Sequence, residues 1–170
     1  LDTLPPIKEG LGTLAGLTGG AVFKGNRLEV LQNGALYPAM KRDIAGAAHT
    51  VHLESFVWTK GKLEREFVEL LSRKAAEGCK VRVLIDAMGG MRADKDQLKR
   101  LAESGTEVSI YCRPHWWNVR RFNHRTHRKL LIIDGTIGYT FGHGIADQWL
   151  GNGEDKDHWR DTAVRAEGPV

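Results

Sequence analysis

The sequence predicts an α/β domain built on a mixed, mostly parallel sheet with helices on both faces. Two observations lead to this prediction. Short apolar runs alternate with helix-period segments between residues 51 and 111, and the changes of pattern fall at glycines or polar turns. A strand-helix-strand-helix-strand order is typical of parallel strands joined by crossover helices. A chain of 170 residues is also long enough to bury a core of its own.

The N-terminal elements have the weaker patterns. Residues 1–20 are rich in Gly, Pro and Leu and are interpreted as an arm or linker, which leaves residues 21–170 as a single domain. Arg27–Leu31 predicts a strand, and the Asn-Gly pair at 33–34 predicts a turn. Ala35–Ala47 carries apolar residues at helical spacing and therefore predicts a helix.

The centre of the chain has the clearest periodicity. Lys62–Glu77 places its apolar residues on one helical face and is followed by Gly78, a common helix stop. Asp94–Glu103 predicts a second helix, with Asp94 as its N-cap. Strands are expected around these helices at Val51–Val57, Val81–Asp86 and Glu107–Tyr111.

The C-terminal third is expected to be mostly strand. Residues 113–126 are interpreted as a loop. Leu130–Ile133 and Thr136–Phe141 predict two strands joined by a hairpin turn at residues 134–135. Ala163–Ala166 predicts another strand of the sheet.

The segment that starts at residue 127 carries the strongest functional signal. His127 and Lys129 are two residues apart, and on a strand they would face the same side, about 6.5–7 Å apart. An imidazole can take a phosphoryl group as a nucleophile, and an ammonium can hold the phosphate oxygens. The pair therefore predicts attack on a phosphodiester.

His127, Lys129 and Asp134 reproduce the H-x-K-x-x-x-x-D signature of the phospholipase D superfamily. The chain resembles the cardiolipin-synthase-like branch of that superfamily, since its flanking segments also follow that branch. These segments are Gly25-Asn26-Arg27, residues 51–58, residues 123–126, residues 145–147 and Trp159-Arg160-Asp161. The resemblance covers roughly residues 20–170 and implies a phospholipase D-like fold.

The resemblance also implies a set of catalytic residues. His127 would form a phosphohistidine, which water or an alcohol then resolves with the help of a second histidine. Lys129 would bind a non-bridging phosphate oxygen. Asp134 would hold the strand end rather than transfer a proton, and Asp161 would accept a hydrogen bond from the other ring nitrogen of His127.

Further residues are candidates for the substrate pocket. Glu54 ends a predicted strand, where it would line the pocket or form an edge salt bridge. Trp116 and Trp117 would contact acyl chains at a membrane interface or pack within their loop. A basic cluster flanks the motif and favours an anionic substrate; it contains Arg113, Arg120, Arg121, Arg125, Arg128 and Lys129.

The sequence departs from the branch just after the motif. The family usually has an asparagine there that donates to the phosphate, whereas this chain has Gly144 at that position, preceded by His143. A lost phosphate donor would cost on the order of 2–4 kcal/mol of transition-state stabilisation. Either His143 compensates or this half works differently, and both positions are included among the substrate-binding candidates.

Charge and motif number indicate the partners. A formal net charge of +4 and a pI near 9.2 favour a phospholipid surface, with nucleic acid as the less favoured alternative. Enzymes of this superfamily need two facing motifs and this chain has one, so a second half is expected from a homodimer or from a missing C-terminal half. No cofactor or metal is expected, because no zinc-type spacing or carboxylate cluster is present.

Three functions fit the sequence. The first is a phosphatidyltransferase or phospholipase D acting on glycerophospholipids. The second is a nuclease of the same superfamily, whose basic cluster and tryptophans would bind a nucleic-acid strand. The third is a non-catalytic half with a decayed site. A membrane-associated location, at a bacterial inner membrane or its cytoplasmic face, is expected from the first, although this chain has no targeting or membrane-spanning segment.

Overall fold

The computed structural model describes residues 7–112 and 125–169, with side chains described from residue 10 onward. Its helices are α1 (Ile7–Thr18), α2 (Leu36–Ala45), α3 (Lys62–Ala76) and α4 (Lys95–Glu103). Its strands are β1 (Arg27–Gln32), β2 (Thr50–Ser55), β3 (Lys80–Asp86), β4 (Glu107–Tyr111), β5 (Leu130–Ile133), β6 (Ile137–Phe141) and β7 (Thr162–Glu167). The described helices and strands of the domain agree with the predicted ones to within a few residues at their ends.

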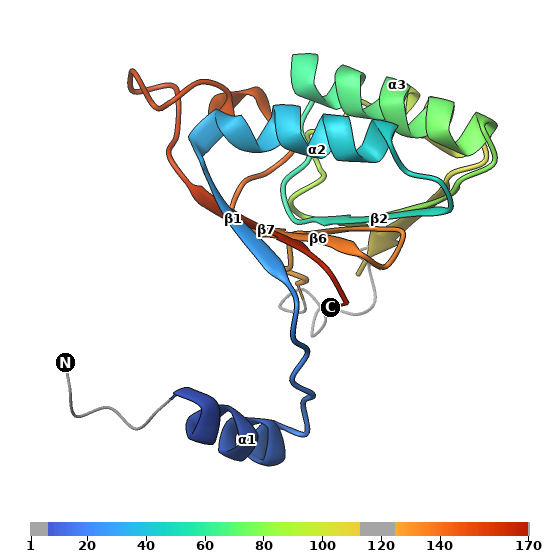
Figure 1. The fold of residues 1–170 in the computed structure, drawn as a ribbon. Coiled ribbons are helices and arrows are strands. Elements are labelled where there is room, and N and C mark those ends of the chain that lie inside the picture. Colours follow the sequence, from blue (N-terminus) through green and yellow to red (C-terminus); the bar gives the residue numbers. More distant parts are fainter. Residues whose placement is uncertain (1–6, 113–124, 170) are drawn as a thin grey trace.

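The described strands form one mixed sheet in the order β1-β7-β6-β5-β2-β3-β4 (Figure 1). The mixed α/β sheet was predicted correctly, but antiparallel pairs outnumber parallel ones. Only β2–β3 and β3–β4 are parallel, because these pairs alone are joined through crossover helices. Asp134 and Gly135 close a hairpin between β5 and β6 with φ angles of 50° and 67°, as a type I′ turn requires.

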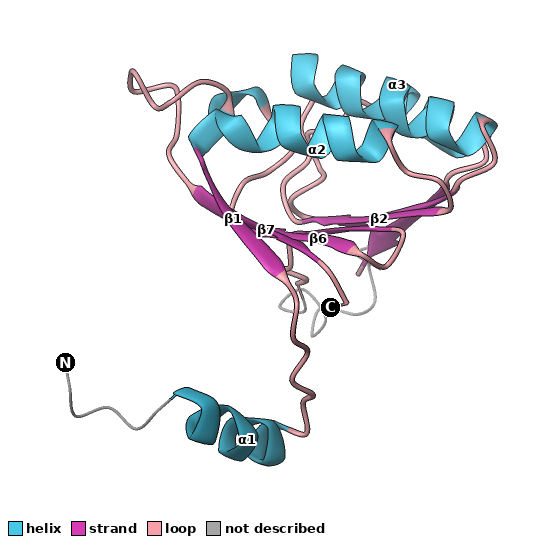
Figure 2. Cartoon of the chain, in the orientation of Figure 1, coloured by secondary structure: helices cyan, strands magenta, loops and turns pink. Residues whose placement is uncertain are grey.

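Helices α2 and α3 lie side by side on one face of the sheet (Figures 1 and 2), and α4 contacts α3 and β4. The expected helices on both faces are therefore not seen in the described part of the chain. The crossovers through α3 and α4 both advance the sheet in the same direction, and right-handed connections then fall on one side. The buried core lies between this helical layer and the sheet, and includes Met40, Ile44, Leu53, Leu63, Phe67, Leu71, Val83 and Leu131.

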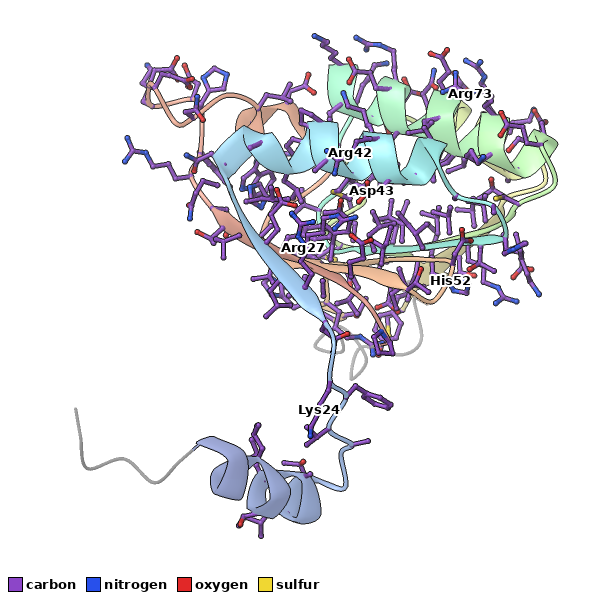
Figure 3. All side chains as sticks on the ribbon, in the orientation of Figure 1. Lys24, Arg27, Arg42, Asp43, His52 and Arg73 are labelled. Atoms are coloured by element: carbon purple, nitrogen blue, oxygen red, sulfur yellow. The ribbon has the colours of Figure 1, made fainter. Side chains whose placement is uncertain are left out.

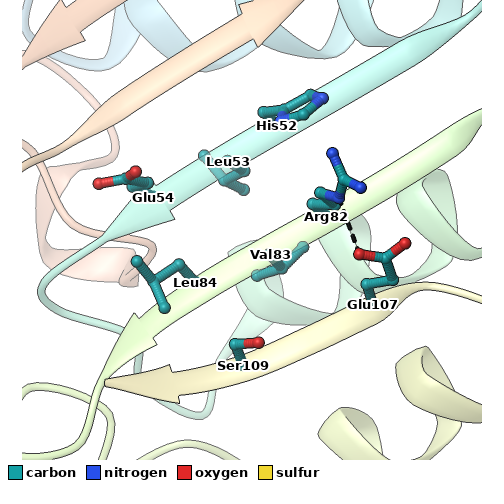
Figure 4. A pocket seen from close by; sticks show the side chains of 8 residues that line it. All are labelled: His52, Leu53, Glu54, Arg82, Val83, Leu84, Glu107 and Ser109. Atoms are coloured by element: carbon teal, nitrogen blue, oxygen red, sulfur yellow. Dashed lines mark hydrogen bonds and ion pairs between the residues drawn. The ribbon is translucent and has the colours of Figure 1, made fainter. Parts of the chain in front are cut away.

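The opposite side, called here the open face, divides into an apolar and a polar half. Strands β1, β7, β6 and β5 form the apolar half, where Leu28 and Val30 are 67% and 61% exposed. Strands β2, β3 and β4 form the polar half shown in Figure 4, where Arg82 pairs with Glu107 at 2.7 Å. Helix α1 stands apart from the sheet (Figure 1). None of the described helices is long and apolar enough to cross a membrane.

A buried ionic contact joins the helical layer to the antiparallel strands. Asp43 of α2 lies between the helix and the sheet (Figure 3) and accepts a hydrogen bond of 2.6 Å from Nε of Arg165. The hydroxyl of Tyr139 donates to the same carboxylate oxygen. The side chains of Asp43 and Arg165 are only 7% and 9% exposed. This contact therefore links α2 to β6 and β7 inside the domain.

Candidate active site

The predicted pair comes together immediately before β5. Nζ of Lys129 lies 3.2 Å from both ring nitrogens of His127 and 3.0 Å from the His127 carbonyl oxygen. His127 is exposed, whereas Lys129 is only 6% exposed. Both side chains alternate with those of the open face, so they project toward the side that also carries the helices. A reactive imidazole and a fixed cation thus share one site.

The buried position of Lys129 changes its acid–base behaviour. Burial lowers the pKa of the Lys129 ammonium below its ordinary value, and the nearby carboxylate of Asp161 opposes that shift. Burial destabilises the charged form of Lys129, and an anion bound beside the ammonium would stabilise that form. The arrangement is therefore suited to binding a phosphate oxygen next to His127.

Phe56 is a site residue that the sequence analysis missed. Its ring centroid lies 4.7 Å from that of His127, and Nζ of Lys129 lies 5.4 Å from the same phenyl ring. The register of β2 against β5 pairs Glu54 with Leu130, which brings the segment after β2 beside the start of the motif strand. That long-range pairing brings Phe56 to the site. The contact could not be predicted from the sequence of either segment alone.

Asp134 bonds to the backbone at the start of β2. Its two carboxylate oxygens accept hydrogen bonds of 2.7–2.8 Å from the backbone N–H groups of Ala48, His49 and Thr50. These bonds hold the far end of β5 to the turn that starts β2. Burial raises the pKa of Asp134 and the three donors lower it, with a net shift below its ordinary value.

Asp161 lies near the pair without bonding to the imidazole. Its carboxylate accepts a hydrogen bond of 2.7 Å from the backbone N–H of Thr162, and its charge acts on Lys129 and on His143. In the described part of the chain, no hydrogen bond joins it to His127. The expected contact with the imidazole nitrogen therefore stays a prediction.

The residues after β6 belong to the core. His143 is fully buried; one ring nitrogen lies 2.9 Å from the carbonyl oxygen of Asn33, and the ring packs edge-on against Tyr37. Burial lowers its pKa, which favours the neutral imidazole. The hydroxyl of Tyr37 donates to the carbonyl oxygen of Gly144 at 2.7 Å. The role of His143 as a substitute phosphate donor stays a prediction.

The other substrate candidates are placed differently. Glu54 and Arg128 form an ion pair of 3.2 Å on the open face, so the structure separates them from the face to which His127 and Lys129 project. This is the edge salt bridge considered as the alternative for Glu54. Arg125 is exposed just before the motif, and Trp116 and Trp117 lie outside the described residues. No group of three or more possible metal ligands occurs in the described ranges.

Known protein families show where this chain belongs. The sequence pattern of a family described as "Cardiolipin synthase, PLD-like domain" matches residues 40–148, which include the whole motif. The chain belongs to this family. Residues 123–134 and their surroundings predicted a resemblance to cardiolipin synthases, and this prediction is confirmed.

Individual relatives agree with the family. The major cardiolipin synthase ClsA of Bacillus subtilis (strain 168) is 34% identical over 151 residues, which are 87% of this chain and 31% of that protein. The cardiolipin synthase PLD-like chain described here thus spans about a third of the length of that curated relative.

Solved structures establish the fold. A phospholipase D family member, Nuc from Salmonella typhimurium, matches with a TM-score of 0.63 and 14% identity, covering 85% of this chain and 86% of that one. Phosphatidylserine synthase from Haemophilus influenzae matches with a TM-score of 0.64 and 16% identity, covering 84% and 33%. The predicted phospholipase D-like α/β fold is therefore confirmed.

Proposed function

We infer that the protein carrying this chain is a phosphatidyltransferase or phospholipase D that acts on glycerophospholipids through a phosphohistidine on His127. The observation that carries this proposal is the contact between the exposed imidazole of His127 and the buried ammonium of Lys129, 3.2 Å apart. The relationship to cardiolipin synthases supports a lipid as the substrate class. Lys129, Asp134 and Asp161 are proposed to complete the site in this half.

The proposed reaction has two balanced steps. A ring nitrogen of His127 attacks phosphorus, and the bond from phosphorus to the head-group oxygen breaks as the nitrogen–phosphorus bond forms. A second histidine gives its proton to the leaving oxygen. Water or an alcohol, deprotonated by that histidine, then attacks phosphorus and releases His127. Water yields phosphatidic acid, whereas an alcohol yields a new phosphodiester.

The second histidine is proposed to come from a second motif. This chain holds one H-x-K motif, so its partner is either another copy of the chain or a further part of a longer protein. His127 is exposed, which is consistent with a site that faces another half. The phospholipid substrate places the assembled enzyme at a membrane surface.

A non-catalytic half is the second candidate, and one observation favours it. A Cβ atom added at Gly144 would lie 2.7 Å from the Trp149 ring and 2.7 Å from Cβ of Val57. The position where relatives are expected to carry a phosphate donor therefore has no room for any side chain. The phosphate would depend on Lys129 and on the partner half, which would slow the reaction or end it.

The test is a quenched mass-spectrometric search for an adduct on the peptide that contains His127. Purified protein is offered short-chain phosphatidylglycerol and, in parallel, a short single-stranded oligonucleotide. His127→Ala removes the nucleophile, and His158→Ala is the matched control, because His158 pairs with Asp155 at 2.8 Å in a surface loop. Native mass recorded on the same sample gives the oligomeric state.

Each outcome has a distinct meaning. A phosphatidyl adduct that is lost in His127→Ala and kept in His158→Ala supports the lipid enzyme. A nucleotidyl adduct would replace it with the nuclease. A stable two-motif assembly that forms no adduct with either substrate would favour the non-catalytic half.

A further inference from the structure

A buried carboxylate outside the motif touches the backbone that leads into it. Asp86 ends β3 and is 1% exposed. Its Oδ2 accepts a hydrogen bond of 2.9 Å from the backbone N–H of Thr126, the residue just before His127. A buried carboxylate of this kind is costly unless it is fully bonded. The bond to Thr126 ties the entry of the motif strand to the end of a strand two places away in the sheet.

The other oxygen of Asp86 holds the turn at residues 88–89. Its Oδ1 accepts hydrogen bonds of 2.9 Å and 3.3 Å from the backbone N–H groups of Met88 and Gly89. Gly89 packs so closely against the chain at residue 56 that an added Cβ atom would lie 1.9 Å from the carbonyl oxygen of Phe56. The carbonyl oxygen of Gly89 also accepts a bond of 3.1 Å from the Trp58 N–H.

The geometry points to Asp86 as a positioning residue that holds His127 from two directions. One direction runs through the Thr126 backbone to His127 itself. The other runs through the 88–89 turn to Phe56, whose ring centroid lies 4.7 Å from that of the imidazole. Both restraints start from one buried side chain, so they move together. Asp86 does not touch the substrate; it sets where the nucleophile stands when the phosphodiester arrives.

This inference deepens the proposed function and rests on it, because it assigns the control of nucleophile geometry at the same site. The direct test is Asp86→Asn, in which the amide can accept hydrogen bonds through one oxygen only. Either Thr126 or the 88–89 turn then faces an amide donor instead of an acceptor. A misplacement of about 1 Å can cost about 100-fold in rate. We expect kcat to fall about 10- to 100-fold and KM to change by about twofold at most.

Asp147→Asn is the matched control. The Asp147 carboxylate also accepts two backbone hydrogen bonds, each 2.8 Å, from the N–H groups of Lys62 and Leu63 at the start of α3. Asp147 therefore makes backbone hydrogen bonds similar to those of Asp86, but at the start of α3. Asp147→Asn is expected to lower the melting temperature without a selective loss of kcat. Equal kcat values in the two folded variants would overturn the positioning role.

Nuclear magnetic resonance gives a readout that needs no activity. The imidazole carbon–proton signal of His127 is expected to shift or broaden in Asp86→Asn and to stay in place in Asp147→Asn. If a wild-type assembly that contains both motifs is inactive on lipid and on oligonucleotide while this shift occurs, the proposed function fails and the positioning role stands. If the wild type is active and the signal and kcat are the same in both variants, the positioning role fails alone.

Phe56 keeps the inference testable if Asp86→Asn does not fold. Phe56→Leu removes the ring behind His127 and leaves Asp86 intact, and Phe56→Tyr keeps the ring. We expect a kcat loss of about 10-fold for the leucine variant and recovery to within about twofold for the tyrosine variant. Wild-type kcat in Phe56→Leu, with an unfolded Asp86→Asn, would overturn the inference.

Discussion

Trp149 fills the space that a side chain at position 144 would need. Its Cζ3 atom would lie 2.7 Å from a Cβ atom on that residue, and Val57 would crowd the same atom from another side. The space beside residue 144 is therefore occupied by core side chains, at the position where the family is expected to carry a phosphate donor. Under the proposed function, the phosphate contact in this chain would therefore come from Lys129.

Gly144→Asn is expected to destabilise the domain rather than restore a donor. Overpacking of a filled core costs about 1–3 kcal/mol, and the new amide would be forced against an aromatic ring. Urea unfolding measures the loss, and Gly138→Asn is the control, because a Cβ atom at Gly138 would meet nothing within 4 Å. A Gly144→Asn variant with higher kcat and undiminished stability would contradict this account.

The Gly144→Asn and Trp149→Tyr changes are expected to interact. A tyrosine ring is smaller, so it should relieve part of the overlap at residue 144. The double variant should therefore unfold at a higher urea concentration than the sum of the two single losses predicts. Strict additivity would show that the Trp149 ring is not the obstacle.

Lys129 is expected to control the alkaline side of the pH profile. Burial lowers its pKa, so the free enzyme should lose its cation, and with it kcat/KM, below the ordinary lysine pKa of about 10.4. Lys129→Arg should retain some activity and lose this alkaline limb, because arginine stays protonated. A profile that is unchanged by Lys129→Arg would exclude Lys129 as the titrating group.

Lys129→Met tests the phosphate contact itself. Loss of one preorganised donor typically lowers kcat about 100- to 1,000-fold, and we expect a loss in that range. Lys62→Met is the control, since the Lys62 side chain is 69% exposed at the start of α3. Similar activities in the two variants would remove Lys129 from the chemistry.

Asp134→Asn is expected to affect stability more than chemistry. The substitution weakens three backbone hydrogen bonds at the far end of β5, which should cost about 1–3 kcal/mol of unfolding free energy. Activity per folded molecule should be retained, as measured by adduct formation on His127 after correction for the folded fraction. A large activity loss in fully folded protein would instead assign Asp134 to the reaction.

The Asp43–Arg165 contact is expected to make stability sensitive to acid. Burial would raise the pKa of Asp43, but the hydrogen bonds from Tyr139 and Arg165 lower it further, and the net pKa lies below its ordinary value. A lowered native pKa stabilises the fold above the ordinary aspartate pKa of about 3.9, and this contribution disappears as pH falls through the native pKa.

Asp43→Asn measures that contribution. Removal of one partner from a buried ion pair costs about 3–5 kcal/mol, so the variant should be less stable than the wild type at pH 7 by about that amount. The difference should narrow as the pH falls below the ordinary aspartate pKa. Asp157→Asn, at an exposed loop residue, is the control. A constant difference at all pH values would refute the titration of Asp43.

Several predictions depended only on local chemistry, and these could be made from the sequence. The helix at 62–76 follows from its apolar spacing, the Asp94 cap from its side-chain oxygen, which accepts from Asp96 N–H, and the turn at 134–135 from the tolerance of Asp and Gly for positive φ. The His127–Lys129 pair belongs to the same class, because residues two apart on a strand share a side whatever the rest of the fold does.

Tertiary structure decided what lies around that pair. Phe56 reaches His127 through the pairing of β2 with β5, and Asp86 reaches Thr126 across 40 residues of sequence. Strand alternation separates Arg128 from His127 although they are neighbours in the chain, and the core encloses His143. Sequence alone determined the family and predicted the His127–Lys129 pair, because both depend on residues close together in the chain. Pairing register and core packing are long-range results of the whole fold, and they decided which other side chains could act on the pair.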